Sequence, residues 1–492
     1  MTSPTLDGQT DSGPALYQKI GLVLGPVVAV ILYLLPPPDT LTPDGWLVVA
    51  IAALMAIWWA TEAIPVPATS MLPIVLMPLL GITTLKETTL PYASPIIFLL
   101  LGGFIVAMGM RRWDLHKRIA LHILTRSGDH PASLIGGFMA ASALLSMWIS
   151  NTATTLMMVP IALSVCHTIL GDRMRGHMYP VALLIGCAWA SSIGGLGTII
   201  GTPPNAFLVS FMAAETGTEI GFLQWMMLGV PVVILMVPLA WFVLTKIAFK
   251  FDASDIKGGS LVVGDALNDM GEITVPEKRV ATIFLIMALA WSFRPALNDI
   301  SILANLSDVG IAVAGAIAMF MVPSGSRLEA NSMLLTWEDA VQLPWGVILL
   351  FGGGLSLAAA ISSTGVAAWI GNGLSGLATL HLFVLSLGIV GTVIFLTELT
   401  SNTATTAALV PVLAAVAVSA DMNPILLAAP TAMAASCAFM LPVATAPNAV
   451  IYSSGFVRIP QMAKAGLWLN IMGTFLISAL CYWLVPVVFV TG

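Results

Sequence analysis

The sequence predicts an all-α polytopic membrane protein with about 11 transmembrane helices and two re-entrant helical hairpins in two inverted-topology repeats. Three observations predict this fold class: the composition, the length of the apolar runs and an internal repeat. Hydrophobic residues fill 58% of the 492 positions and charged residues only 9%, whereas soluble proteins carry roughly 25% charged residues. The apolar residues form runs of about 20, which is long enough to cross a bilayer as a helix. The chain therefore has too little charge to cover a water-facing surface.

Composition also excludes several classes of function. The four cysteines lie in apolar segments without metal-site spacing, which favours packing over a disulfide or a metal centre. The net charge of −6 gives no sign of nucleic-acid binding. The longest polar stretch, 251–278, is too short to bury a core of its own, so we expect a linker there and not a soluble catalytic domain. The start of the chain lacks the basic region of a signal peptide, so we expect no cleavable one.

Hydrophobic runs locate the expected spans. They lie near 18–36, 46–61, 69–81, 95–110, 179–200, 222–249, 279–295, 303–323, 345–363, 423–445 and 464–488. Two further apolar regions, 132–168 and 380–419, are about twice as long as one span, and the triplet Ser-Asn-Thr breaks each in its middle. Either region could form two full spans or one re-entrant hairpin, and both choices leave the later loops on the same sides.

The basic residues indicate which loops lie inside. With the N-terminus in the cytoplasm, only Lys86 and Arg294 of the 18 Lys and Arg residues fall outside, as the positive-inside rule requires. We therefore expect a multi-pass protein of the plasma (cytoplasmic or inner) membrane with a cytoplasmic N-terminus. The segment 111–126 mixes basic and apolar residues at near-helical spacing, which favours an interfacial helix over a solvated loop.

An internal repeat carries most of the functional signal. The segment Ser150–Thr155 reads Ser-Asn-Thr-Ala-Thr-Thr and recurs as Ser401–Thr406, at an offset of 251. A second motif, Thr202–Ala206, is matched by Thr445–Ala449 at an offset of 243. Five predicted spans separate the two broken regions, so the copies should enter from opposite faces. Inverted repeats with interrupted segments in matching places indicate a secondary transporter with a site near the midplane.

Each motif has a physical reason to line a polar cavity. A Ser-Asn-Thr turn in hydrocarbon would leave backbone groups unsatisfied, at several kcal/mol each. If the triplet is a hairpin tip, the next helix begins at Thr152 or Thr403, and its free N–H groups and positive dipole end favour an anion. The breaks near 201–205 and 444–448 free carbonyl oxygens, which are hard ligands suited to Na⁺. Two tips and two breaks together predict a composite site for cations and an anion.

Basic residues are scarce where that site is expected. Arg173 and Arg175 are the only Lys or Arg residues between 127 and 216, and none occurs from 328 to 457. A bound anion would lack a fixed cationic partner and would need co-bound cations, which couples its binding to theirs. The region also lacks the relay of His and carboxylate side chains that proton-driven carriers use.

The motifs resemble those of the divalent-anion/sodium symporter family, the di- and tricarboxylate carriers. The resemblance rests on the paired triplets, on Trp58–Pro65 (Trp-Trp-Ala-Thr-Glu-Ala-Ile-Pro) and on the two Thr-x-Pro-Asn breaks, and it spans about 58 to 449. It implies a homodimer in membrane lipid whose scaffold and transport domains work by an elevator movement. It also implies Na⁺-coupled symport of C4-dicarboxylates such as succinate, malate or fumarate.

The resemblance also implies a division of the chain. The expected ranges are 1–17, a cytoplasmic tail; 18–126, scaffold helices and the interfacial helix; 127–250, the first hairpin and transport-domain helices; 251–278, a cytoplasmic linker; 279–376, scaffold helices of the second repeat; and 377–492, the second hairpin and transport-domain helices.

The family's site residues carry over by motif. The substrate carboxylates would meet Ser150, Asn151, Thr152, Thr202, Ser401, Asn402, Thr403 and Thr445. The first Na⁺ site would use Ser146, Ser150, Asn151 and Gly201, and the second would use Thr397, Thr400, Asn402 and Ala444. Position 446 is Ala where its repeat partner is Pro203, a departure that bears on the geometry of the second break.

Other interpretations stay open at this point. The carrier could exchange dicarboxylates without Na⁺, or it could take citrate or sulfate. A membrane-embedded hydrolase using Ser150 or Ser401 would need a base near the serine, and no His or Lys is an obvious candidate, so we expect no enzyme activity. Glu398, an intramembrane carboxylate with no acidic repeat partner, could accept structural hydrogen bonds or tune cation affinity. Glu62 is expected to anchor a turn or to pair across domains.

Overall fold

In the described part of the chain, the regular secondary structure consists of helices joined by loops, apart from a single bridge between Pro323 and Met333. The computed structural model describes residues 16–251 except 175, 259–326, 332–373, 376 and 380–490. Within these residues, nine helices are long and apolar enough to cross a membrane. The prediction of an all-α, multi-pass membrane protein is confirmed.

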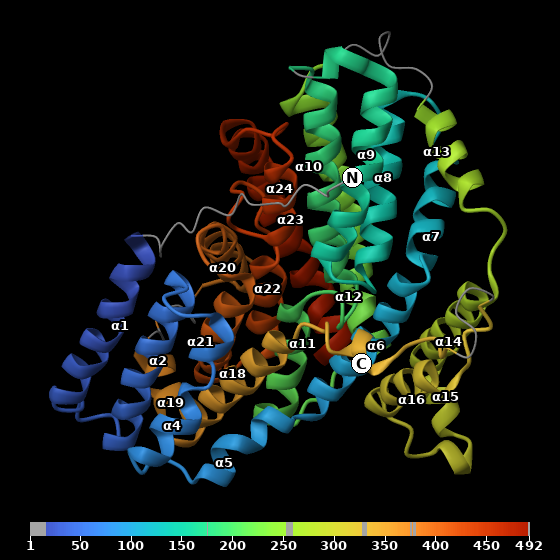
Figure 1. The fold of residues 1–492 in the computed structure, drawn as a ribbon. Coiled ribbons are helices and arrows are strands. Elements are labelled where there is room, and N and C mark those ends of the chain that lie inside the picture. The colour runs from blue at the N-terminus through green and yellow to red at the C-terminus, as the bar shows by residue number, and fades with distance from the viewer. Residues whose placement is uncertain are drawn as a thin grey trace, which may run out of the picture.

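The helices of the first half are taken in two sets, in chain order (Figure 1). The first set comprises α1 (Leu16–Leu34), α2 (Pro43–Thr61), α3 (Val66–Thr69), α4 (Leu72–Leu79), α5 (Leu85–Thr89), η1 (Leu90–Ala93), α6 (Pro95–Arg112) and α7 (Leu115–Leu124). The second comprises α8 (Pro131–Ser146), α9 (Asn151–Leu170), η2 (Gly171–Met174), α10 (Met178–Gly194), η3 (Gly195–Gly197), α11 (Pro203–Phe211), η4 (Met212–Thr216), α12 (Phe222–Phe242) and η5 (Val243–Ala248).

The second half of the chain also contains a helical hairpin followed by a broken span. It continues with α13 (Gly259–Asp269), α14 (Val275–Ser292), α15 (Arg294–Asn298), η7 (Ser301–Leu303), α16 (Asp308–Met321), α17 (Trp337–Ala340), α18 (Trp345–Ser363) and α19 (Val366–Gly373). It ends with α20 (Leu382–Thr397), α21 (Asn402–Ser419), α22 (Ile425–Ala435), α23 (Ala446–Ser453), α24 (Ile459–Val485) and η9 (Pro486–Val490).

Several predicted spans are shorter or broken in the structure. The run 69–81 is interrupted between α3 and α4, where Pro73 stands in the first turn of α4 and cannot donate a helical hydrogen bond. The run 303–323 becomes helical only at Asp308, because the Ser307 hydroxyl caps the helix by accepting a bond from Gly310 N at 3.0 Å. The predicted linker 251–278 contains α13 and the first turn of α14.

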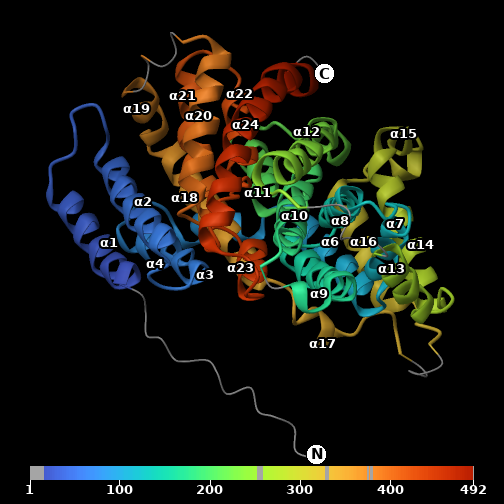
Figure 2. The ribbon, with the colours of Figure 1, turned by 90° about the horizontal axis from the view of Figure 1, so that it is seen from above.

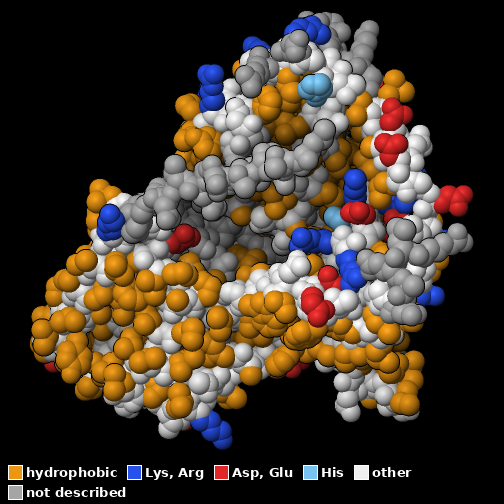
Figure 3. Space-filling model, in the orientation of Figure 1, with side chains coloured by type: hydrophobic (Ala, Val, Ile, Leu, Met, Phe, Trp, Pro, Cys, Tyr) orange, Lys and Arg blue, Asp and Glu red, His pale blue; other side chains and the backbone are white. Residues whose placement is uncertain are grey.

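Burial separates the centre of the molecule from its edges. Every residue of 179–197, in the α10–η3 segment, is buried, whereas only 11% of the residues in the apolar window of α1 are buried. Seen from above, α1 and α2 lie along one edge and α14 with α15 along the opposite one, while the hairpins, α10 and α22–α24 lie between them (Figure 2). Apolar side chains cover the surface over α1 to α5 (Figure 3), as contact with lipid requires.

The two regions interrupted by Ser-Asn-Thr each form a pair of helices joined by a short loop. Loop 147–150 joins α8 to α9, and loop 398–401 joins α20 to α21. The first loop ends at the break between α10 and α11, where Thr198 Oγ1 donates a hydrogen bond to Met147 O. Because α11 continues past this break, the loop reaches only part of the way along the α10–α11 span. This arrangement of the first loop is the one that a re-entrant hairpin predicts.

Candidate functional site

The first hairpin tip starts a helix with the triplet itself. Ser150 has extended backbone angles (φ −56°, ψ 142°), and its Oγ accepts a hydrogen bond from Ala153 N at 3.3 Å. This is an N-cap, so α9 begins at Asn151 and points its free N–H groups at the tip. Ser150 is exposed, and Asn151 and Thr152 are half-buried. The tip therefore offers helix-end donors and hydroxyls to a ligand.

Asn151 lies inside a cluster of oxygen atoms. Its Oδ1 position is 2.6 Å from Ser146 Oγ and 3.2 Å from the carbonyl oxygens of both Gly201 and Ser191. With the amide nitrogen turned there, it donates to all three. With the amide oxygen there, four oxygens face one another, and a cation is what would hold them together. Gly195 leaves room for this cluster, because a Cβ on it would lie 2.7 Å from Asn151 Oδ1 and 3.0 Å from Gly201 O.

The second tip repeats the pattern with one difference. Thr397 Oγ1 donates to Asn402 Oδ1 at 2.8 Å and to Ala435 O at 2.9 Å, as Ser146 does toward Asn151 in the first half. Ser401 also precedes the helix with extended angles, but its side chain makes no capping bond. Ser401 and Asn402 are half-buried, and Thr403 is buried. The hydroxyl of Ser401 is therefore free of the capping role that Ser150 has.

Hydrogen bonds inside the two helices follow the same offset of 251. Thr155 Oγ1 donates to Asn151 O at 2.9 Å, and Thr406 Oγ1 donates to Asn402 O at 2.8 Å. Thr400, which the family pattern adds to the second Na⁺ site, shares a 2.6 Å hydrogen bond with Thr405 Oγ1. The Thr400 hydroxyl is therefore engaged within the hairpin. Its backbone oxygen is the atom that could bind Na⁺.

The two breaks end in the same backbone conformation, although the non-helical stretch covers 198–202 in the first half and 436–445 in the second. Thr202 precedes α11 with φ −145° and ψ 143°, and Thr445 precedes α23 with φ −142° and ψ 150°. Both helices start at the next residue, Pro203 in one half and Ala446 in the other. Thr445 Oγ1 also accepts from Asn448 N at 3.3 Å, so a side-chain cap accompanies Ala446 where the first break has Pro203. The backbone conformation just before each helix is therefore the same although Ala446 stands where the first break has Pro203.

The side chain of Glu398 binds backbone N–H groups of the second break. Its carboxylate accepts hydrogen bonds from the backbone N–H groups of Phe439 (2.6 Å), Met440 (2.9 and 3.0 Å) and Leu441 (3.1 Å). Asn470 Nδ2 donates to it at 2.8 Å, and the Glu398 side chain is buried. Unwinding of the α22–α23 span leaves these N–H groups without helical partners, and Glu398 satisfies them. The bonds match the first of the two roles considered for this residue.

Each hairpin packs against the helix that follows the break in the other half of the chain. Helix α9 of the first hairpin contacts α23 beyond the second break, and α21 of the second hairpin contacts α11 beyond the first. Trp189 Nε1 on α10 donates to Phe439 O in the second break at 3.1 Å. Thr202 and Ala444 are buried and Thr445 is half-buried, whereas Val443 is 82% exposed. Each hairpin therefore contacts the helix that follows the break of the other half, and part of the second break is exposed.

Sequence reasoning missed some residues of this region. Ser191, Gly195 and Ala435 contribute to the two oxygen clusters without belonging to either motif. Asn205 and Asn448 stand inside the Thr-x-Pro-Asn motifs, and a repeat at matched positions was the signal that could have singled them out.

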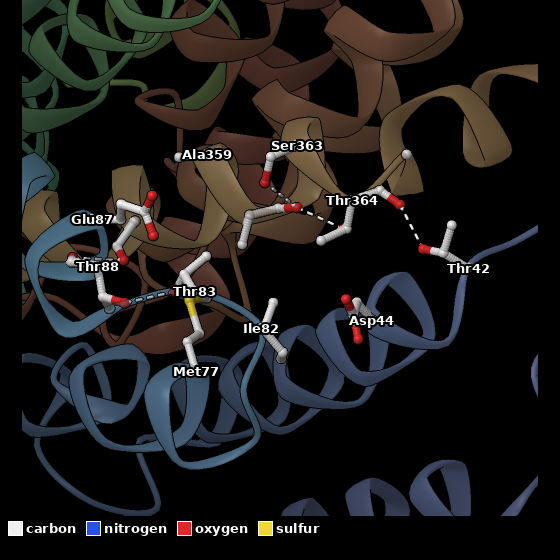
Figure 4. Close-up of a pocket in the computed structure, with 13 residues that line it drawn as sticks. Thr42, Asp44, Met77, Ile82, Thr83, Glu87, Thr88, Ala359, Ser363 and Thr364 are labelled. Atoms are coloured by element: carbon white, nitrogen blue, oxygen red, sulfur yellow. Dashed lines mark hydrogen bonds between the residues drawn. The ribbon is translucent and has the colours of Figure 1, made fainter.

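A cavity of about 720 Å³ lies elsewhere, between α2, the α4–α5 region and α18 (Figure 4). Asp44, Glu87 and Ser363 are among the residues that line it, and none of the predicted site residues does. The Thr84 backbone N–H and hydroxyl both donate hydrogen bonds to the Glu87 carboxylate, at 2.8 Å each. We assign no ligand to this cavity.

Comparisons with known proteins agree with the geometry. The family model described as sodium:sulfate symporter transmembrane region matches residues 17–490. The sodium-dependent dicarboxylate transporter SdcS of Staphylococcus saprophyticus is 40% identical over 477 residues, covering 95% of this chain and 92% of that one. The protein of the same name from Staphylococcus aureus (strain bovine RF122 / ET3-1) is 41% identical over 478 residues, covering 96% and 92%.

A solved structure supports the fold. The crystal structure of the Alcanivorax borkumensis YdaH transporter, described as having an unusual topology, matches with a TM-score of 0.58 and 14% identity. The match covers 88% of this chain and 98% of that one, and at this identity it speaks for the fold alone. The family match over nearly the whole chain confirms the resemblance carried by the paired triplets. The chain therefore belongs to the sodium:sulfate symporter family, that is, the divalent-anion/sodium symporters, which are transporters and not enzymes.

Proposed function

We propose that this protein is a secondary active transporter that couples the uptake of C4-dicarboxylates, such as succinate, malate and fumarate, to Na⁺. The observation that carries the proposal is the matched pair of hairpin tips, where one helix begins at Asn151 and the other at Asn402, with no Lys or Arg residue in either tip. Relatives about 40% identical are named sodium-dependent dicarboxylate transporters, which supports the choice of cation and anion.

With the amide oxygen of Asn151 facing the carbonyls, the first cluster fits Na⁺ in the chemistry of its oxygen atoms. Ca²⁺, an ion close to Na⁺ in radius, holds oxygen ligands at about 2.3–2.6 Å, so two ligands at right angles lie roughly 3.3–3.7 Å apart. The 3.2 Å separations from Asn151 are close to that spacing. We infer that Ser146, Ser150, Asn151 and Gly201 bind one Na⁺, and that Ser191 O is a further ligand. Thr397, Thr400, Asn402 and Ala444 bind a second Na⁺ in the matching place.

The dicarboxylate then binds between the two tips. Ser150, Asn151 and Thr152 bind one carboxylate through hydroxyls and the α9 N-terminus, with Thr202 beside them, and Ser401, Asn402, Thr403 and Thr445 bind the other. Neither tip and neither break contains a Lys or Arg residue. The two sodium ions therefore supply the positive charge that a dianion needs away from water, which makes binding of the anion depend on Na⁺.

Alternating access follows from the division of the chain. We infer that 127–250 and 377–492 move together as a transport domain in an elevator movement against scaffold helices in 18–126 and 279–376, and that the two halves are inverted repeats. The protein is further inferred to be a homodimer of the plasma membrane with a cytoplasmic N-terminus. The distribution of the basic residues supports that orientation.

Uptake of radiolabelled succinate into proteoliposomes tests the function. We expect uptake to require an inward Na⁺ gradient and to be lost in Asn151→Ala and Asn402→Ala. Asn372→Ala is the matched control, because Asn372 is exposed on α19. Full uptake with K⁺ in place of Na⁺ would contradict coupling, and uptake that requires internal dicarboxylate would instead indicate an exchanger. Strong competition by citrate or sulfate would reassign the anion, and the family description makes sulfate a necessary competitor.

A further inference from the structure

The first break is held by one buried asparagine. Asn205 Nδ2 donates to the carbonyl oxygens of Thr198 at 2.8 Å, Gly195 at 3.0 Å and Leu196 at 3.3 Å. Thr198 O also accepts a hydrogen bond from Gly201 N at 3.4 Å, closing a turn over 198–201. The carboxamide of Asn205 therefore holds the turn that ends at Gly201, whose own carbonyl faces Asn151.

The second break contains two of these three bonds in the same places. Asn448 Nδ2 donates to Leu441 O at 3.0 Å and to Ala438 O at 3.1 Å. Leu441 O also accepts from Ala444 N at 3.3 Å, which closes a turn over 441–444. All four residues of this arrangement lie 243 positions after their counterparts, so the repeat extends from the sequence motif to hydrogen bonds that shape the break.

In both asparagines the amide N–H groups make the hydrogen bonds to the rest of the described structure and the amide oxygen makes none. Asn205 and Asn448 are fully buried, and within the described residues the Oδ1 atom of neither has a hydrogen-bond partner. Each carries an uncompensated buried oxygen, which costs free energy. A side chain that only filled space would avoid this cost, so the donors have a purpose that an apolar residue could not serve.

We propose that Asn205 and Asn448 are positioning residues for sodium binding: each holds its break in the shape that presents the carbonyl of Gly201 or Ala444 to the cation. This inference rests on the proposed function. Neither asparagine is placed among the ligands. Each acts through the carbonyl of Thr198 or Leu441, and removal of the amide frees the turn to rotate its last carbonyl away from the cation.

Thermal unfolding of the purified protein without dicarboxylate, over a range of Na⁺ with choline as the replacement ion, tests the inference. The half-stabilising Na⁺ concentration reports cation affinity separately from the stability in choline alone. We expect Asn205→Ala and Asn448→Ala each to raise that concentration about tenfold or more, because the freed carbonyls lose their buried donor. Asn372→Ala should leave it unchanged.

Asn205→Asp provides a second readout that a purely structural role would not move. A carboxylate has the shape of the amide but no donor, and only its protonated form can donate to Thr198 O. The half-stabilising Na⁺ concentration of Asn205→Asp should therefore approach that of the wild type as pH falls. Asn205→Ala should show no such approach, whatever its own stability.

The outcomes separate the two proposals. A wild-type protein that Na⁺ does not stabilise, with Na⁺-independent uptake, would overturn the proposed function. A wild type that Na⁺ stabilises, with both alanine variants keeping its half-stabilising Na⁺ concentration, would overturn only the positioning role. A lower melting temperature in choline with unchanged Na⁺ dependence would likewise assign the asparagines to stability alone.

Discussion

The carboxylate of Asp308 accepts a hydrogen bond from the backbone N–H of Phe222 at 2.9 Å, so a residue at the start of α16 caps the first turn of α12. Arg294 Nε lies 3.2 Å from the other oxygen of the same carboxylate, and Trp291 Nε1 donates to Asp308 O at 2.9 Å. An anion at a helix N-terminus satisfies free N–H groups and interacts favourably with the helix dipole.

Aromatic rings extend this contact to the first hairpin. Phe222 stacks on Trp291 with ring centroids 4.1 Å apart and on Trp148 at 6.0 Å. Trp148 lies in the loop that ends at Ser150, and it also meets Phe284 edge-on at 4.9 Å. The helices α14 and α16 belong to the range inferred to stay fixed, whereas α12 and the hairpin belong to the range inferred to move. The elevator movement that we propose must break the bond between Asp308 and Phe222.

Asp308→Ala should destabilise the protein by about 1–3 kcal/mol, because it leaves Phe222 N and Arg294 without their partner. Asp308→Asn should cost less, since its amide oxygen can still accept from Phe222 N. Thermal unfolding in detergent checks the order of the two variants, with Asp299→Ala as an exposed control. Equal melting temperatures for Asp308→Ala and the control would show that the cap contributes nothing.

Gly195→Ala should abolish stabilisation by Na⁺ at concentrations that saturate the wild type. The added Cβ would lie 2.7 Å from Asn151 Oδ1 and 3.0 Å from Gly201 O, in the space of the oxygen cluster. Gly264→Ala is the matched control, because a Cβ there meets open space on α13, where Ala also favours the helix by roughly 0.5–1 kcal/mol. A Gly195→Ala protein with wild-type Na⁺ dependence would place the cation elsewhere.

Glu398→Ala should lower the stability by about 3 kcal/mol or more, because three backbone N–H groups of the second break lose their acceptor together. Glu398→Gln keeps one oxygen acceptor but brings an NH₂ group against N–H donors, so it should fall between the wild type and Glu398→Ala. Melting temperatures of the three proteins give the test, with Glu272→Ala as the exposed carboxylate control. If Glu398→Gln melts like the wild type, the negative charge is dispensable.

His116 should make the protein less stable in acid. Burial of its ring lowers its pKa, and this effect outweighs the 3.0 Å hydrogen bond to Met110 O and the nearby Asp114, both of which raise it. The unfolded chain then binds a proton at higher pH than the folded one, so stability falls as pH drops below the ordinary His pKa of about 6.5. The loss between neutral and mildly acidic pH should be smaller in His116→Gln than in the wild type. The exposed His122→Gln serves as control, and an unchanged pH dependence in His116→Gln would refute the assignment.

Much of the fold could be predicted because it depends on patterns along the chain. Run length and low charge identified a membrane protein, and the triplet repeat located both hairpins, whose helices start at Asn151 and Asn402. Boundaries were less predictable where polar caps or prolines act within an apolar run, as at Ser307 and at Pro73. Of the candidate site, the motif residues were found, whereas Ser191 and Ala435 were not, because backbone carbonyls act regardless of the side chain that carries them.

The sequence by itself determined that this is a helical transporter and that its two halves carry matched polar breaks, since hydropathy, charge and repetition are properties of the chain as written. Tertiary structure alone decided which groups meet at the breaks. Glu398 binds N–H groups at 439–441, 41 to 43 positions along the chain, and Asp308 caps a helix 86 positions away. Such partners are set by how separate helices pack, because a backbone group freed by a break bonds to whatever side chain the fold places within reach.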